Sequence, residues 1–140
     1  MRFWDASAIV PLLVQEQLSP RADTLLAEDR AIVTWWGTMV ECSSALARQH
    51  RDYGLDLAGL QAATARLRRL ALSWIEVPAV QPVREQALRL LRIRALRAGD
   101  AVQLAAALVT AEFRPDTLEF VTFDTRQATA AELEGFRVLA

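Results

Sequence analysis

The 140-residue sequence contains no lysine and no asparagine, and it has only one cysteine and one histidine. Without lysine, the chain cannot use Schiff-base catalysis, a lysine general base or a P-loop lysine. The single thiol, Cys42, cannot form a disulfide within the chain, which favours a cytoplasmic location. Because cysteine and histidine are so scarce, a zinc site built from these two residue types is disfavoured.

Long apolar runs are also missing, although 53% of the residues are hydrophobic. No run approaches the roughly 18 residues that would cross a bilayer. Asp5 interrupts the first apolar stretch, so the N-terminus does not have the layout of a signal peptide. We therefore expect a cytoplasmic protein with no membrane contact and, from its length, one domain over residues 1–140.

The charge balance excludes a protein that coats nucleic acid nonspecifically. The net charge is −1, and all 16 basic residues are arginine. Proteins that bind nucleic acid over a large surface are usually strongly basic. Any contact of this chain with nucleic acid must therefore be local.

Short β-like runs alternate with helical segments along the chain, without repeats or linker-like stretches. The predicted strands are residues 2–4, 31–34, 73–77, 119–122 and 136–139. The predicted helices are 7–15, 19–29 with Ser19 as N-cap, 39–53 before a turn at Gly54, 56–72, 82–96 ended near Gly99, 100–112 and 126–133. This alternation predicts an α/β fold with a parallel sheet covered by helices on both faces.

Two aspartates directly follow predicted strands, in the segments FWDASAIV and FVTFDTR. They are Asp5 and Asp124, and ligands of parallel sheets bind beyond the carboxyl ends of the strands. Two further acids, Glu41 and Asp100, lie near the starts of helices that can flank this edge. We therefore expect the four acids to share one site.

Each of these acids also has a purely structural explanation as a helix cap. Aspartate is a favoured N-cap residue, and all three aspartates precede a predicted helix. Thr38 and Glu41 have the spacing of a capping box. A glutamine also follows an acid after three residues in two pairs, Asp100–Gln103 and Asp124–Gln127. Capping explains each acid singly, but the four together favour a shared role.

Four carboxylates at one edge would repel one another, and a divalent cation would remove that conflict. An all-oxygen ligand set suits Mg²⁺ or Mn²⁺. Calcium is less favoured because the chain has no EF-hand loop. Mg²⁺ held by a few carboxylates keeps open positions, which suits chemistry on phosphate esters.

Four segments together resemble a PIN domain, most closely the VapC-type toxin of VapBC toxin–antitoxin pairs. The segments are FWDASAIV, WGTMVECSSALAR, LRAGDAVQLAAAL and LEFVTFDTRQATAAELEGFRVL. The resemblance covers nearly the whole chain, and its last two segments are the most specific. It implies a PIN-like three-layer α/β/α sandwich around a mainly parallel sheet of 4–5 short strands.

The resemblance also implies a function and a set of site residues. It implies an endoribonuclease dependent on Mg²⁺ or Mn²⁺, usually a homodimer, that is silenced by a cognate VapB-type antitoxin. The family's acidic quartet, which binds the metal and carries catalysis, falls on Asp5, Glu41, Asp100 and Asp124. Small hydroxyl residues that support the acids fall on Ser7 and Thr122, whereas Trp35 and Trp36 replace smaller residues of many relatives.

We expect Asp5 and Asp100 to hold a first metal ion. Glu41 and Asp124 would then complete its outer sphere, orient water or hold a second ion. The sequence indicates neither the number of ions nor which RNA is cut. Because an acidic site repels a polyanion, the substrate also needs nearby cations.

Arginines supply the candidate cations, since their planar fork suits phosphate. They lie upstream of Asp100 and along the predicted helix that carries Glu41, at Arg89, Arg92, Arg94, Arg97, Arg48 and Arg51. Contact with RNA, contact with antitoxin acids and simple solvation all remain open for them. Trp35 and Trp36 could stack an unpaired base, or pack in a core or a dimer interface.

Other classes fit the residues less well. A receiver-like phosphoacceptor needs a lysine, and a haloacid-dehalogenase-like phosphatase needs an Asp-x-Asp pair where this chain has Asp5-Ala6-Ser7. A PIN-like flap nuclease would be larger, with helical insertions. The main alternative is a catalytically degenerate PIN domain that only binds a protein partner, which an intact acidic quartet disfavours.

Overall fold

The computed structural model describes all 140 residues and contains one five-stranded sheet. The strands are β1 (Arg2–Trp4), β2 (Ile32–Trp35), β3 (Ile75–Val77), β4 (Glu119–Val121) and β5 (Arg137–Leu139). They lie in the order β3-β2-β1-β4-β5, and every neighbouring pair is parallel. The predicted parallel sheet is therefore confirmed, with five strands.

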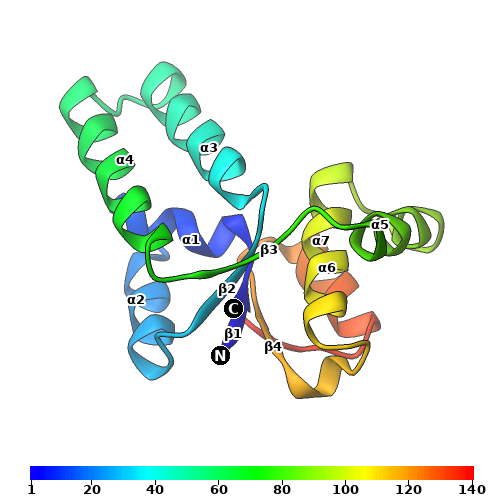
Figure 1. The fold of residues 1–140 in the computed structure, drawn as a ribbon. Helices are drawn as coiled ribbons and strands as arrows, with labels where there is room; N and C mark the ends of the chain where they lie inside the picture. The colour runs from blue at the N-terminus through cyan, green and yellow to red at the C-terminus, as the bar shows by residue number, and fades with distance from the viewer.

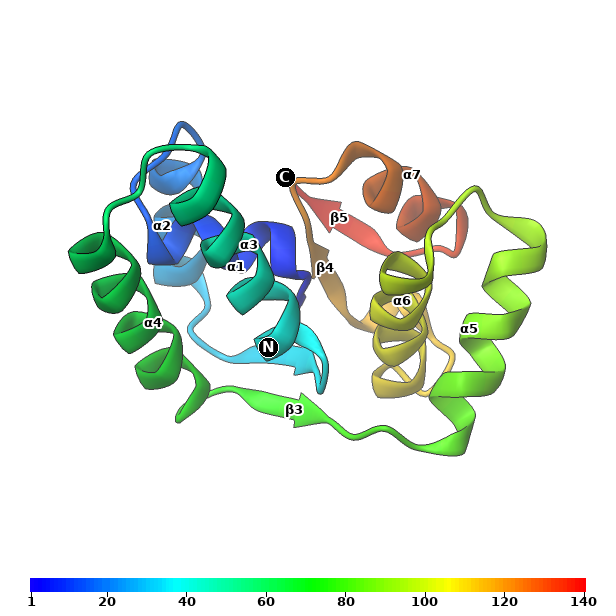
Figure 2. The ribbon, with the colours of Figure 1, turned by 90° about the horizontal axis from the view of Figure 1, so that it is seen from above.

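Seven α-helices and one short 3-10 helix connect the strands. They are α1 (Ala6–Leu13), α2 (Ser19–Glu28), α3 (Thr38–Asp52), α4 (Leu57–Ala71), α5 (Gln81–Ile93), α6 (Ala98–Thr110), η1 (Pro115–Thr117) and α7 (Thr125–Leu133). Helices α1 to α4 cover one face of the sheet, and α5 to α7 cover the other (Figures 1 and 2). The result is the predicted three-layer α/β/α sandwich.

Alternation along the short strands divides the apolar residues between two cores. Phe3 packs with α5, α6 and α7, whereas its neighbour Trp4 packs with α1 to α4, because successive strand residues point to opposite faces. In β4, Phe120 and Val121 divide in the same way. The strands therefore read as continuous apolar runs, as expected for a sheet buried on both faces.

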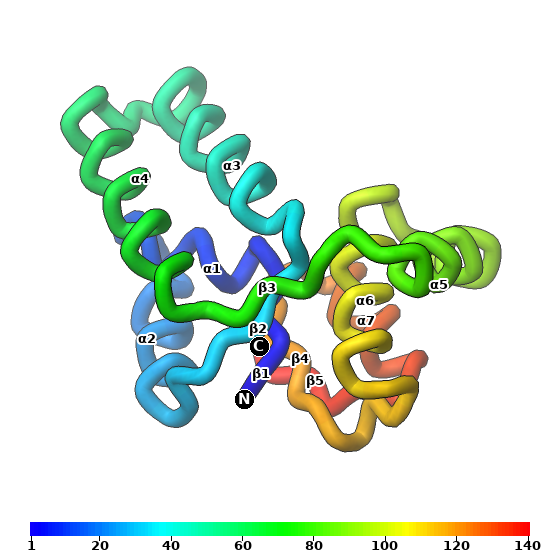
Figure 3. The backbone as a smooth tube through the Cα atoms, viewed as in Figure 1, coloured from blue at the N-terminus to red at the C-terminus, as the bar shows by residue number.

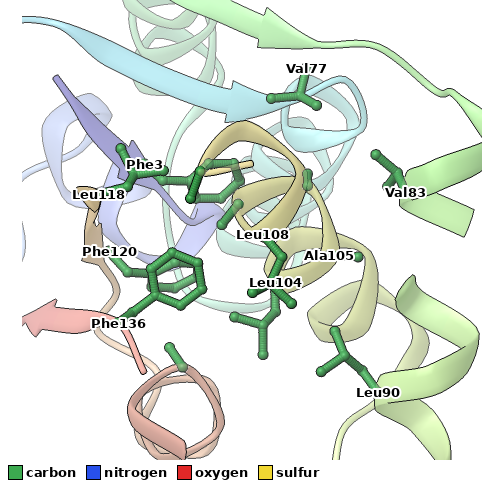
Figure 4. Close-up of a cluster of buried hydrophobic side chains, with 14 of the residues drawn as sticks. Phe3, Val77, Val83, Leu90, Leu104, Ala105, Leu108, Leu118, Phe120 and Phe136 are labelled. Atoms are coloured by element: carbon green, nitrogen blue, oxygen red, sulfur yellow. The ribbon is translucent and has the colours of Figure 1, made fainter. Parts of the chain in front are cut away.

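Aromatic rings and small residues make up the core beneath α6 (Figure 4). The rings of Phe3 and Phe120 stack with centroids 5.3 Å apart, and Phe136 lies 5.6 Å from Phe120. The fully buried alanines of α6 let its backbone approach the sheet closely, while Leu104 fills the space between them. This close packing fixes the helix that carries Asp100.

Three local predictions are wrong in detail. Helix α5 ends at Ile93 instead of near residue 96 because Arg94 adopts an extended conformation and its side chain binds Glu134. Helix α6 begins at Ala98, so Gly99 lies inside its first turn. Ser19 is the first helical residue of α2 and not its N-cap; its hydroxyl instead donates to the backbone carbonyl groups of Pro11 in α1 and of Val14 after it.

Helices α3 and α4 form a hairpin that is plain in the tube view (Figure 3). Between them the chain reverses at Gly54, whose φ of +80° suits glycine, as the sequence predicted. None of the helices combines the length and apolar character needed to traverse a bilayer.

Candidate functional site

The strand order places a topological switch point between β1 and β4. From β1 the chain continues to β2 and β3 on one side, whereas β4 and β5 lie on the other side. Open α/β sheets bind ligands at such a point, beyond the carboxyl ends of the strands. Asp5 directly follows β1, and Thr122 directly follows β4, so both lie at this edge.

The Asp5 carboxylate is buried and held by two hydroxyl groups. Only 5% of the residue is exposed. Ser7 Oγ donates to Asp5 Oδ2 at 2.6 Å, and Thr122 Oγ1 donates to the same oxygen at 2.9 Å. The Phe123 amide in turn donates to Ser7 Oγ at 2.9 Å, which fixes that hydroxyl. Both predicted supporting residues therefore contact Asp5.

Burial raises the pKa of Asp5. The hydroxyl groups of Ser7 and Thr122 partly oppose this shift, and the negative charge of Asp100 adds to it. In the α1 helix Asp5 occupies the N-cap position, yet its side chain makes no capping hydrogen bond. Capping therefore does not explain this aspartate.

Glu41 lies in the first turn of α3 and faces the same edge. Burial raises its pKa to about 7, the Gln103 amide opposes the shift, and the charges of Asp5 and Asp100 increase it. Its Oε2 lies 4.0 Å from the position that a Cβ on Gly99 would occupy, so the starts of α3 and α6 are close. The N-cap of α3 is Gly37 and makes no side-chain cap, so the predicted Thr38–Glu41 capping box is absent.

The other two acids have structural roles in the helices that carry them. Asp100 Oδ2 accepts from the Arg97 backbone N–H at 3.2 Å in the first turn of α6. Asp124 is the N-cap of α7, and its Oδ1 accepts from the Gln127 backbone N–H at 2.9 Å. Both side chains are half-buried, so helix capping leaves part of each carboxylate open to solvent.

The structure brings Asp5, Glu41 and Asp100 close enough for their charges to interact. None of the seven ion pairs of the chain involves any of the four predicted acids. No three acidic, histidine or cysteine side chains are arranged as a ready-made metal site. The acids at this edge therefore form no ion pair to any side-chain cation, and burial together with the neighbouring charges raises the pKa values of Asp5 and Glu41.

The predicted cationic arginines divide into two groups. Arg89 and Arg94 both donate to Glu134, at 2.6 and 2.8 Å, so the chain itself uses them. Arg51 pairs with its neighbour Asp52 at 3.2 Å. In the second group, the exposed Arg48, Arg92 and Arg97 form no ion pair.

A cavity of about 340 Å³ lies beside Glu41 between α1 and α3. Ser7, Glu41 and Arg48 line it, so a basic side chain faces the acidic edge there. The two tryptophans lie before α3. Trp36 is 55% exposed, whereas the Trp35 indole covers Gly37 and lines a separate apolar groove on α5 and α6.

The remaining single residues occupy ordinary positions. Cys42 is fully buried, and burial beside Glu41 raises the pKa of its thiol to about 12, which leaves it unreactive. His50 is exposed on α3, and its Nδ1 contacts the Leu55 carbonyl oxygen at 2.6 Å. The charges of Glu41 and Asp5 add to the rise in the Cys42 pKa, so this buried thiol lies behind the acidic edge.

Sequence reasoning missed two buried glutamines, Gln103 and Gln127, and the buried Thr38, all fully inaccessible to solvent. Each of these residues lies three positions from an acid in the sequence, but that spacing predicts helix capping. Gln103 instead bonds Thr38, and Gln127 bonds the Asp100 backbone. Only a fold that packs α3, α6 and α7 around one edge reveals these contacts.

Comparisons with solved structures identify the type of fold. The chain matches no family model and no curated protein. It is similar to the solved structure of FitAcB from Neisseria gonorrhoeae, with 18% sequence identity and a TM-score of 0.69 over 100% of this chain and 97% of that chain. It is also similar to the structure of PAE2754 from Pyrobaculum aerophilum, with 22% identity and a TM-score of 0.66 over 92% of this chain and 83% of that chain. The fold is PIN-like. A third structure, FitAB bound to an IR36 DNA fragment, matches at 16% identity and a TM-score of 0.67, over 99% of this chain and 94% of that chain.

Proposed function

We propose that this protein is a single-domain Mg²⁺- or Mn²⁺-dependent endoribonuclease, the toxin of a type II toxin–antitoxin pair. One observation carries the proposal: the buried Asp5 carboxylate lies at the switch point of a PIN-like fold, beside Glu41 and Asp100, with no side-chain cation to balance them. Uncompensated buried carboxylates are costly, and functional sites are where such groups gather.

The residues present fit a hard divalent cation. All the donors are carboxylate oxygens, and those of Asp5 and Glu41 have raised pKa values that a bound cation would lower. We assign Asp5 and Asp100 as the principal ligands, with Glu41 and Asp124 as outer-sphere groups or as ligands of a second ion. When bound, the metal supplies an activated water and neutralises charge on the phosphoryl oxygens.

The chain's own residues orient these ligands. The hydroxyl groups of Ser7 and Thr122 both point at Oδ2 of Asp5, which fixes the rotation of that carboxylate. Loss of such hydrogen bonds to a ligand typically weakens metal binding by about 10- to 100-fold. Half-buried Asp100 and Asp124 remain open to water, so a phosphate could approach from their side.

Substrate RNA needs cations beside the acids, and ion pairs within the chain leave fewer arginines available for this role. Arg48 lines the cavity beside Glu41, and Arg97 lies three residues before Asp100. Both are exposed and free of ion pairs, so we assign them to phosphate contacts. Trp36 is exposed before α3, and we assign it to stack an unpaired base.

We further propose a VapB-type antitoxin as the partner, a homodimer as the functional state and a cytoplasmic location. The sequence resemblance supports the antitoxin, and the FitAB structure, solved with a DNA fragment, supports an assembly that also binds DNA. The apolar groove between α5 and α6, with Leu88 and Leu91 exposed, supports a dimer face. A monomer at high protein concentration would count against that face.

Induced expression with mapping of the 5′ ends of RNA fragments tests the activity and identifies the substrate. Purified protein should then cleave that RNA with Mg²⁺, and excess chelator should stop the reaction. Asp5→Asn should abolish cleavage without unfolding the protein, and Asp23→Asn, on the exposed surface of α2, is the matched control.

The alternative is a degenerate PIN domain that only binds its partner. The lack of a ready-made metal site favours it. Antitoxin binding by a protein that cleaves no RNA under any divalent metal would establish this alternative.

A further inference from the structure

Two fully buried glutamines connect the helices that carry the acids. Gln103 lies on α6, three residues after Asp100, and Gln127 lies on α7, three residues after Asp124. The spacing suggests capping, but neither amide side chain caps its own helix. Each reaches across to a different helix.

Gln127 links Asp124 to Asp100. Its backbone N–H donates to Asp124 Oδ1 at 2.9 Å, and its side-chain Nε2 donates to the Asp100 backbone carbonyl at 3.0 Å. The first bond fixes the Asp124 carboxylate, and the second fastens the start of α7 to the first turn of α6. One residue therefore fixes two acids relative to each other.

Gln103 links the start of α6 to the start of α3. Its Nε2 donates to Thr38 Oγ1 at 3.2 Å, and the Thr38 hydroxyl lies 3.4 Å from Gln103 Oε1. Thr38 is the first residue of α3, three residues before Glu41. The Gln103 amide also acts on the Glu41 carboxyl, where it opposes the rise in pKa.

Packing alone does not explain a glutamine at either position. Both side chains are fully buried, where leucine or methionine would fill a similar volume without polar atoms. Gln127 Oε1 has no hydrogen-bond partner, an unfavourable state for a buried acceptor. Exchanging the amide nitrogen and oxygen would place Oε1 against the Asp100 carbonyl oxygen, so the amide cannot turn to satisfy it.

We propose that Gln103 and Gln127 are positioning residues that hold α3, α6 and α7 together, so that Glu41, Asp100 and Asp124 face one metal site. The inference rests on the proposed function for its metal, but the contacts between the helices are independent of it. Neither glutamine touches substrate or the ion in this assignment. Each acts through the backbone or side chain of its partner helix.

Calorimetric titration of the purified protein with Mn²⁺ tests the proposal. It compares the wild-type protein with the variants Gln127→Met and Gln103→Met. Gln61→Met, at an exposed position on α4, is the matched control. We expect about 10- to 100-fold weaker Mn²⁺ binding in each buried variant, the range seen when outer-shell partners are removed, and unchanged binding in the control. The thermal midpoint of the metal-free Gln127→Met protein should change little, because removal of the unpaired Oε1 offsets the loss of the bond to the Asp100 carbonyl.

A merely structural role gives the opposite pattern, in which the thermal midpoint falls and Mn²⁺ affinity stays the same; that result overturns the proposal. If Gln103→Met does not fold, Thr38→Val removes the same contact from α3 and should weaken Mn²⁺ binding equally. Unchanged binding by Thr38→Val rejects the α3–α6 contact.

Metal-free crystal structures of the wild-type and Gln127→Met proteins separate this proposal from the proposed function. If the wild-type protein binds no Mn²⁺, the proposed function fails, but the distance between Asp100 and Asp124 still decides the role of Gln127. A changed distance in the variant supports positioning, and an unchanged distance overturns it.

Discussion

Thr122 Oγ1 donates a 2.9 Å hydrogen bond to Asp5 Oδ2, although 117 residues separate them in the chain. The contact arises because β1 and β4 are neighbours in the sheet, with Trp4 opposite Val121. The next residue or two beyond each strand then meet at one edge. A buried carboxylate thus receives its hydrogen bonds from a distant segment, and its orientation depends on the complete sheet.

Removal of the Thr122 hydroxyl should weaken both metal binding and the fold. In Thr122→Val we expect Mn²⁺ affinity to fall about 10- to 100-fold. The free energy of unfolding should fall by about 1–3 kcal/mol, since a buried carboxylate loses one of its donors. Calorimetric titration and urea unfolding measure the two effects. Thr129→Val, an exposed hydroxyl on α7, is the control, and equal Mn²⁺ affinity in the two variants would contradict the assignment.

The metal-free protein should lose stability as pH rises towards 7 and above. Burial raises the pKa of Glu41 from 4.5 to about 7 in the folded state, so folded protein holds this proton more tightly than unfolded protein does. The contribution of Glu41 to stability is therefore greatest below about pH 4.5 and is lost as the pH rises through the pKa of Glu41 in the folded protein. Asp5, whose pKa is also raised, acts in the same direction.

Urea unfolding in chelator at pH 5 and pH 8 measures this effect, and Glu41→Gln should reduce the difference between the two values. Excess Mg²⁺ at pH 8 should restore stability to the wild-type protein and do so less in the variant. Identical pH profiles for wild-type and Glu41→Gln proteins would show that Glu41 titrates normally.

Asp124 has a capping role and a proposed metal role, and substitutions can separate them. Asparagine and serine cap helices nearly as well as aspartate, whereas alanine at an N-cap costs about 1 kcal/mol. Asp124→Asn should therefore keep the thermal midpoint but lose RNA cleavage, while Asp124→Ala should lose both. Cleavage at the wild-type rate by Asp124→Asn would leave Asp124 as a helix cap only.

The packing of α6, which carries Asp100, against the sheet should contribute strongly to the free energy of unfolding. Leu104 is fully buried in the core shown in Figure 4, so Leu104→Ala should cost about 2–5 kcal/mol of unfolding free energy. Leu72→Ala, at a residue that is 89% exposed, should change stability by less than about 0.5 kcal/mol. Similar losses in the two variants, measured by urea unfolding, would contradict this packing.

The sequence predicts the element order well because apolar periodicity and breakers are local. Every predicted strand and helix is present, and most boundaries differ by one or two residues. The one larger departure has a long-range cause: α5 ends early because Arg94 binds Glu134, which lies 40 residues further along the chain. No local pattern contains that contact.

The sequence predicts only part of the candidate site. Asp5 and Asp124 both follow strands, β1 and β4, which are neighbours in the sheet; a site shared by all four acids stays a prediction. Local spacing suggested caps for all the acids, yet Asp124 accepts a capping bond whereas Asp5 does not. The sequence could not show which hydroxyl and amide groups would hold them, because those bonds depend on how separate helices pack.

Anomalous scattering from a crystal soaked in Mn²⁺ tests the central claim most directly. We expect a peak at the carboxyl edge of β1 and β4, about 2.0–2.3 Å from an Asp5 oxygen and within bonding distance of at least one more of the four acids. A well-soaked crystal with no peak at that edge, or with manganese bound only elsewhere on the surface, would contradict it.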